Sequence, residues 1–153
     1  MKRLLLLGIL LQGCISLLWA DGVNGLSLAE GTNVLREHFN AELYRSIQMC
    51  DIEYVREALA NGADVNDVSR YSGETPLLRA IDREDMDIIS MLIGKGADVN
   101  YANSYGGETP LLRAVSLQNI GIIEMLIKHG VDVDYPNKLG RTPLMRAFFS
   151  TES

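Results

Sequence analysis

The sequence predicts an all-α repeat protein, a solenoid of about three and a half stacked units. An eight-residue segment, GETPLLRA, occupies residues 73–80 and recurs at 107–114, and an altered copy, GRTPLMRA, occupies 140–147. The period is 34 and then 33 residues, and segments 71–104 and 105–138 are identical at 19 of 34 positions. Self-similarity at a fixed period of this size indicates supersecondary units that bury their apolar faces against one another.

Each full unit carries signals for two helices. Thr75 supplies a capping hydroxyl and Pro76 suits the first helical position, so a helix is expected from there to about Arg83. Asp85 then caps a second helix, which Gly96 ends because glycine adopts the left-handed conformation without strain. The second helix has apolar residues at helical spacing: Met86, Ile89, Leu92 and Ile93. The third unit repeats these signals at Thr109-Pro110, Asn119 and Gly130.

The first unit keeps the apolar register but lacks the Thr-Pro motif before Leu43, as expected of a terminal capping repeat. Before it, residues 21–32 predict a tether, and Asn33 is expected to cap a short helix to about His38. The sequence divides into these expected parts: a signal peptide at 1–20, a linker with a short helix at 21–38, an N-capping repeat at 39–70, full repeats at 71–104 and 105–137, and a half repeat at 138–153.

The N-terminus has the build of an export signal. Lys2 and Arg3 precede an eight-residue apolar stretch, and Ala20 ends a candidate cleavage site. Two alternatives remain open at this point. Cys14 ends a stretch similar to a bacterial lipobox and is a candidate for lipidation, and the apolar stretch is also a weak candidate for an uncleaved anchor. With only Cys14 and Cys50 present, no intramolecular disulfide framework is expected.

Composition excludes some partners. The formal charge is −6. Without residues 1–20, which include Lys2 and Arg3, 12 basic and 20 acidic residues remain, for a charge of −8. Nucleic acid and anionic membrane surfaces are therefore excluded as the main partner, because affinity for phosphate backbones requires clustered Lys and Arg. A membrane association is expected only through the signal or a lipid.

The repeated Thr-Pro-Leu-x-x-Ala, followed about twenty residues later by Gly-Ala-Asp-Val-Asn, resembles the ankyrin repeat over about residues 40–150. The resemblance implies helix pairs joined by hairpin-like finger loops and stacked into a curved solenoid. Three departures stand out. Leu78, Leu112 and Met145 replace the histidine of the family, so apolar packing is expected there. The first two fingers are one residue longer than the third, and the half repeat holds only a first helix, which leaves Phe148 and Phe149 without a second.

The resemblance also implies a partner-binding surface on fingers and concave helices. Its positions fall on Tyr71, Ser72, Glu74, Asp82, Arg83, Tyr105, Gly106, Glu108, Ser116 and Leu117. Tyr71 and Tyr105 are favoured for recognition because tyrosine offers a large rigid surface with a polar tip. For Tyr101 and Tyr135, recognition and packing of finger on finger both remain open.

Other polar groups have structural interpretations. Stacking should align Arg79, Arg113 and Arg146 into a ladder, and pairing with carboxylates such as Glu74 and Glu108 is favoured over docking of an anionic partner. The Asp-Val-Asn/Asp segments at 64–66, 98–100 and 132–134 are expected to form turns rather than calcium sites. His129 is expected to complement a helix C-terminus. Phe148 is expected to pack on the second helix of the third repeat, and Phe149 has no assigned role.

No catalytic, metal-binding or phosphate-binding motif is present, so no cofactor, small-molecule substrate or enzymatic activity is expected. The sequence predicts an exported bacterial scaffold, most readily periplasmic, with a lipoprotein as the alternative location. It would bind an unidentified protein through preorganised fingers. The alternative is a structural or accessory envelope subunit that acts through assembly by way of Cys14 or the two phenylalanines.

Overall fold

The computed structural model of the chain describes residues 28–150. The expected signal peptide, the lipidation candidate Cys14 and residues 21–27 of the tether lie outside this range. Between residues 28 and 150, no helix combines the length and the apolar character needed to cross a membrane. The chain divides into two compact units, residues 1–35 and 36–153. The second unit holds the repeats and is described here by itself.

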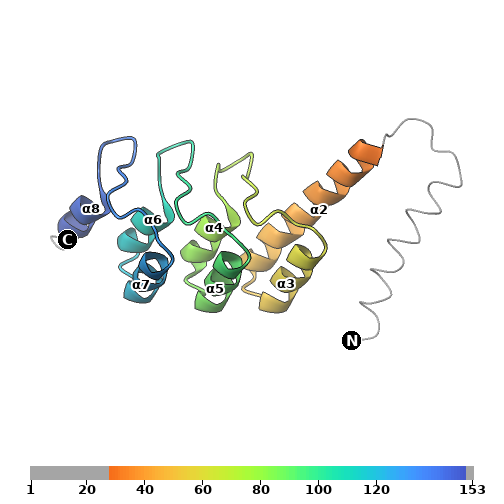
Figure 1. The fold of residues 1–153 in the computed structure, drawn as a ribbon, viewed down its shortest axis with the longest axis horizontal. Helices are drawn as coiled ribbons and strands as arrows, with labels where there is room; N and C mark the ends of the chain where they lie inside the picture. The colour runs from red at the N-terminus through yellow and green to blue at the C-terminus, as the bar shows by residue number, and fades with distance from the viewer. Residues whose placement is uncertain (1–27, 151–153) are drawn as a thin grey trace, which may run out of the picture. The chain divides into compact units, whose positions relative to one another are not determined.

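The described residues form helices and no strands (Figure 1). The helices are α2 (Leu28–Gln48), α3 (Ile52–Ala60), α4 (Pro76–Arg83), α5 (Met86–Gly94), α6 (Pro110–Ser116), α7 (Ile120–Lys128) and α8 (Pro143–Ser150). They pair as α2–α3, α4–α5 and α6–α7, and a finger loop follows each pair on the same side of the stack (Figure 1). The prediction of an all-α solenoid with about three and a half repeats is confirmed.

The first helix differs from the prediction. Instead of a short helix that ends near His38, α2 runs without interruption from Leu28 to Gln48, so the expected boundary at residues 38–39 falls inside it. No glycine or proline stands between Asn33 and Gln48 to break the helix. The polar residue next to that boundary, Asn40, is buried and bonds to the following finger rather than starting a new helix.

The capping signals act as the sequence predicts. The hydroxyls of Thr75 and Thr109 accept hydrogen bonds from the backbone N–H groups three residues later, at 3.4 and 3.2 Å. Asp85 and Asn119 cap the second helices in the same way, with distances of 3.1 Å. These bonds satisfy N–H groups that lack an intrahelical partner. Local chemistry therefore fixes where each helix begins.

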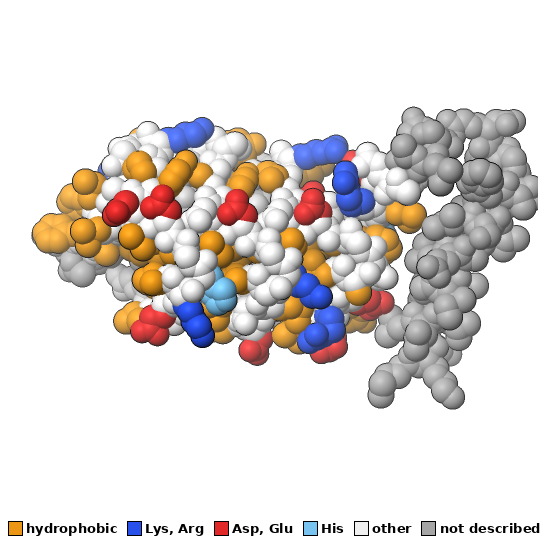
Figure 2. All heavy atoms as spheres, in the orientation of Figure 1, with side chains coloured by type: hydrophobic (Ala, Val, Ile, Leu, Met, Phe, Trp, Pro, Cys, Tyr) orange, Lys and Arg blue, Asp and Glu red, His pale blue; other side chains and the backbone are white. Residues whose placement is uncertain are grey.

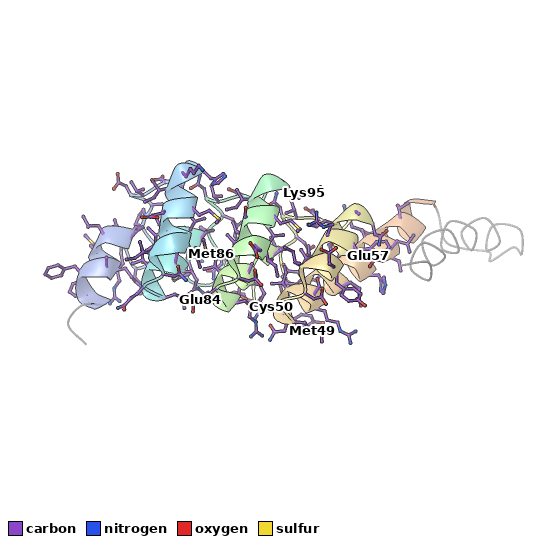
Figure 3. All side chains as sticks on the ribbon, turned by 90° about the horizontal axis from the view of Figure 1, so that it is seen from below. Met49, Cys50, Glu57, Glu84, Met86 and Lys95 are labelled. Carbon is purple, nitrogen blue, oxygen red and sulfur yellow. The ribbon has the colours of Figure 1, made fainter. Side chains whose placement is uncertain are left out.

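The turns between the two helices of each pair were not predicted. In each, a residue other than glycine adopts the left-handed conformation: Cys50, Glu84 and Gln118 have φ values of 54°, 55° and 56°. Figure 3 shows Cys50 and Glu84 at these turns, beside the labelled Met49 and Met86. A left-handed residue other than glycine is uncommon. Its recurrence at one repeat position shows that the helix pair imposes this conformation.

The core consists of the apolar residues at the repeat positions. Leu78 and Leu112, which replace the family histidine, are fully buried, so the predicted apolar packing there is confirmed. Met145, the third residue at this position, is instead half exposed. Phe148, which was expected to pack on α7, leaves 65% of its surface exposed. Its ring lies edge-to-face with that of Phe149, at a centroid distance of 5.8 Å.

Candidate functional site

The finger loops are held by asparagine side chains that connect successive repeats. The side-chain oxygen of Asn66 accepts from the backbone N–H of Asp98 at 2.8 Å, and its amide nitrogen donates to the carbonyl of Gly96 at 3.0 Å. Asn100 makes the same two bonds one repeat later, to Asp132 and Gly130. Each asparagine thus fixes the base of one finger to the base of the next.

The aspartates at the finger bases form turns. The carboxylates of Asp64, Asp98 and Asp132 each accept from the backbone N–H two residues later, at 2.9, 2.8 and 3.0 Å. This is the expected Asx-turn geometry. Within residues 28–150 no group of three His, Cys, Asp or Glu side chains is arranged to hold a metal ion.

Adjacent fingers also contact each other near their tips. The phenol of Tyr101 donates to the carbonyl of Gly73 on the preceding finger at 3.1 Å. The ring of Tyr105 lies against the same glycine, since a Cβ added to Gly73 would come within 2.9 Å of it. The next finger joins through a backbone hydrogen bond from Lys138 to Gly106 at 3.0 Å. The three fingers therefore form one connected row.

Two of the predicted recognition residues are exposed on this row. Tyr71 is 96% exposed and Tyr105 is 68% exposed. Tyr101 is largely covered, and its hydrogen bond to Gly73 places it in the packing of finger on finger. Tyr135 is exposed. The row therefore presents aromatic surface to the solvent on a backbone that is already ordered.

The arginines of the first helices lie in ion pairs. Arg79 lies 3.0 Å from Glu74, and Arg113 lies 3.3 Å from the other oxygen of the same carboxylate. Arg113 also contacts Asp82 at 2.8 Å. The side chains are only partly exposed, so solvent screens these pairs less than it screens surface pairs. One carboxylate thus joins arginines of two successive repeats.

The same arrangement continues into the half repeat. Glu108 lies 3.9 Å from Arg113 and 3.5 Å from Arg146. The expected ladder of arginines is therefore present, and so is the pairing with Glu74 and Glu108 that the sequence favoured. The network gives the helix-one face alternating charges rather than a free cationic stripe.

The remaining positions carried over from the family are dispersed. The hydroxyl oxygen of Ser72 is buried and has no hydrogen-bond partner among the described residues. Ser116 donates to the carbonyl of Leu112 within its own helix at 2.8 Å. Arg83, Gly106 and Leu117 are exposed. The structure thus brings together the acidic members of the set, and leaves Arg83 and Leu117 open at the ends of α4 and α6.

A further site residue, Tyr44 on α2, was not predicted. Its phenol lies 2.8 Å from two carbonyls of the first finger, those of Asp67 and Glu74, and its single proton serves both. Burial raises the pKa of Tyr44 far above its usual value of 10.0, and the nearby Asp67 carboxylate adds to the rise. The phenol therefore remains a hydrogen-bond donor even in alkaline solution.

An open groove of about 710 Å³ lies between α2 and the first finger, and Tyr44, Asp67, Tyr71 and Arg79 are among its lining residues. Desolvation by burial also raises the pKa of the Asp67 carboxyl, although a hydrogen bond from Asn40 at 2.7 Å opposes the rise. The groove begins beside the most exposed tyrosine of the fingers. It extends the finger row toward the first repeat.

The two histidines lie on α2 and at the C-terminal end of α7. The ring of His38 stacks edge-on against Phe39, at a centroid distance of 5.5 Å. His129 follows α7 as its C-cap, and its ring nitrogen Nδ1 lies 2.8 Å from the carbonyl of Met125. Both contacts are local. The position of His129 agrees with the expected complement to a helix C-terminus.

Comparison with known proteins agrees with this geometry. The family model for ankyrin repeats, in three copies, matches residues 43–137. A search of curated proteins found no match. The matched range covers more than half of the chain and includes α3 to α7 with all but the last finger. The chain belongs to the ankyrin-repeat family.

Proposed function

We propose that this protein is a non-enzymatic scaffold of the bacterial cell envelope that binds a protein partner through its fingers and the concave, helix-one side. Ankyrin repeats are generally protein–protein interaction modules. The envelope location rests on Lys2, Arg3 and the apolar stretch after them, which have the build of an export signal. Cleavage after Ala20 gives a periplasmic protein, and lipidation at Cys14 would give a membrane-attached one.

The observation that carries the proposal is the exposure of Tyr71 on an ordered finger. A side chain that is 96% exposed contributes almost nothing to the fold, yet the backbone beneath it is hydrogen-bonded at Ser69 and Gly73. Tyrosine is enriched at binding hot spots. Ordering before binding lowers the entropy lost on association. Tyr71 and Tyr105 are therefore the residues whose removal should weaken binding most.

The ion-pair network argues against a partner that is held mainly by charge. Glu74 and Glu108 are each shared between two arginines and Asp82 contacts Arg113, so the charges of this face are already partly compensated. A partner held mainly by charge would have to displace these pairs. Contact through the tyrosines leaves these ion pairs in place.

Affinity capture from the native envelope tests the proposal. The wild-type chain, the double variant Tyr71→Ala/Tyr105→Ala and the control Tyr54→Ala are used as bait. Tyr54 is an exposed tyrosine on α3, away from the fingers. A partner recovered with wild type and Tyr54→Ala, but at least about tenfold less with the double variant, supports recognition through the fingers.

Equal recovery with all three baits contradicts finger recognition. Because Tyr105 packs against Gly73, thermal unfolding of the double variant must accompany the capture, and recovery is compared only below its melting temperature. Intact mass on the same sample distinguishes cleavage after Ala20 from lipidation at Cys14.

A second candidate, a structural envelope subunit that acts through assembly, is favoured by one observation: both Phe148 and Phe149 are mostly exposed on α8. In that case the finger variants should behave as wild type in the capture.

A further inference from the structure

The end of the repeat stack formed by α7 and α8 exposes apolar residues whose equivalents in the preceding repeat are buried. Leu144 is 79% exposed, whereas its equivalent Leu111 is 3% exposed. Ile127 on α7 is 52% exposed, whereas its equivalent Ile93 is 9% exposed. These positions pack against the next repeat inside the stack. Within the described residues, nothing covers them at this end.

Six large apolar side chains make up this surface, which we call the end face: Ile120, Ile127, Leu144, Met145, Phe148 and Phe149. Figure 2 shows hydrophobic side chains gathered at the end of the stack where α8 lies. From their exposed fractions, and fully exposed areas on the order of 150–200 Å² for each, the six expose about 600 Å². That is at the upper limit of the largest apolar patch on a typical monomer.

The size and chemistry of the end face suit a second copy of the same chain. Two such faces in contact would bury about 1,200 Å², which reaches the lower limit of a specific protein interface. None of the six side chains is ionised, so the contact itself places no like charges against each other, although each chain carries a formal charge of −6. Leu144 and Phe148 stand four residues apart on α8 and therefore form one ridge.

The first helix pair, at the other end of the repeat stack, presents charged side chains beside its exposed Met49 and Tyr54. The exposed surface of the first helix pair carries ion pairs, Glu42 with Arg45 and Glu53 with Arg56, both at nearly 4 Å. Head-to-tail stacking would place the end face against these ion pairs and remove them from water, at a cost in desolvation. Contact between two identical end faces avoids this cost and gives a closed, two-fold arrangement instead of an open filament.

We propose that the end face is a homodimer interface, in which the Leu144–Phe148 ridge of one copy packs against the same ridge of a second copy. The fingers lie outside this interface. A dimer therefore presents two independent finger rows to partners, and its formation does not depend on the function proposed for the fingers.

Sedimentation equilibrium tests the proposed dimer. The sample is the protein as the expressing cell processes it, with no further truncation. An interface of this size should associate at protein concentrations of about 1–100 μM. Over this range the apparent mass should rise from that of the monomer toward twice that value. Leu144→Glu/Phe148→Glu should remain monomeric throughout. Tyr54→Glu, which adds a charge at an exposed aromatic residue outside the face, and Tyr71→Ala/Tyr105→Ala should dimerise as wild type does.

Two results overturn the proposal. The first is that the wild-type chain remains monomeric up to about 100 μM. This result is independent of whether any variant folds. The second is an oligomer that persists in Leu144→Glu/Phe148→Glu, since association would then arise elsewhere. Because both substitutions replace exposed side chains, the double variant should unfold at the melting temperature of monomeric wild type.

Discussion

Removal of one oxygen atom, in Tyr44→Phe, should destabilise the repeat stack and loosen its first finger. The phenol lies 2.8 Å from the carbonyls of Asp67 and Glu74, the two ends of that finger. Without it, two partly buried carbonyls lose a donor that water replaces incompletely. A net hydrogen bond is worth about 1 kcal/mol and an unsatisfied buried acceptor costs more, so the expected loss is about 1.5 kcal/mol.

Thermal and urea unfolding of the variant measure this loss. Since 1 kcal/mol shifts the melting temperature of a domain of this size by about 4 °C, the expected decrease is about 6 °C. The urea midpoint should fall with no change in slope, because the surface exposed on unfolding is the same. Tyr54→Phe is the matched control, since Tyr54 is exposed on the neighbouring α3, and it should unfold as wild type does.

The pH dependence adds a second test. The folded pKa of Tyr44 is raised above the unfolded value of 10.0, so its contribution to stability is fully present below pH 10. It is lost progressively as the pH rises from there toward the folded pKa, because only the unfolded phenol ionises. The difference in unfolding free energy between wild type and Tyr44→Phe should therefore become smaller above pH 10. A gap below about 0.3 kcal/mol at pH 7, or one that widens at high pH, would refute the reasoning.

Two further substitutions test the finger geometry. Asp67→Asn should raise the melting temperature at pH 7 and leave it unchanged at pH 3. Burial raises the folded pKa of Asp67, so the charged form present at pH 7 destabilises the folded state, whereas the protonated form does not. A variant that is less stable than wild type at pH 7 would contradict this. Gly73→Ala should destabilise more than Gly140→Ala in thermal unfolding: both glycines have positive φ, 65° and 74°, but only at Gly73 would a Cβ meet the Tyr105 ring, at 2.9 Å. Equal losses would show that the ring moves freely aside.

Much of the fold could be predicted from the sequence because its signals are local. Thr75, Asp85 and Gly96 act within one turn of chain, so their roles follow from residue type and spacing alone. The uninterrupted α2 was missed because Asn33 suggested the cap of a short helix and the repeat period begins only near residue 40. Asn40 instead bonds to Asp64 and Asp67, partners that only the folded repeat supplies.

The candidate site was less predictable, since its residues act across repeats. The sequence placed Tyr101 and Tyr105 four residues apart in one finger, but could not tell that Tyr101 donates to the preceding finger while Tyr105 retains an exposed surface. Likewise, an arginine every repeat indicates a ladder. Only the structure shows that Glu74 joins two of its members.

Tyr44 shows which signal was available. It stands 34 residues before Leu78, at the position where Leu112 also lies one repeat later. In the full repeats this position is apolar and fully buried, whereas in the first repeat, which lacks the Thr-Pro motif, a phenol reaches the finger backbone. A polar residue at an otherwise apolar repeat position is thus the signal to look for. In this chain it marks the hydrogen bonds that join the capping repeat to the backbone of the first finger.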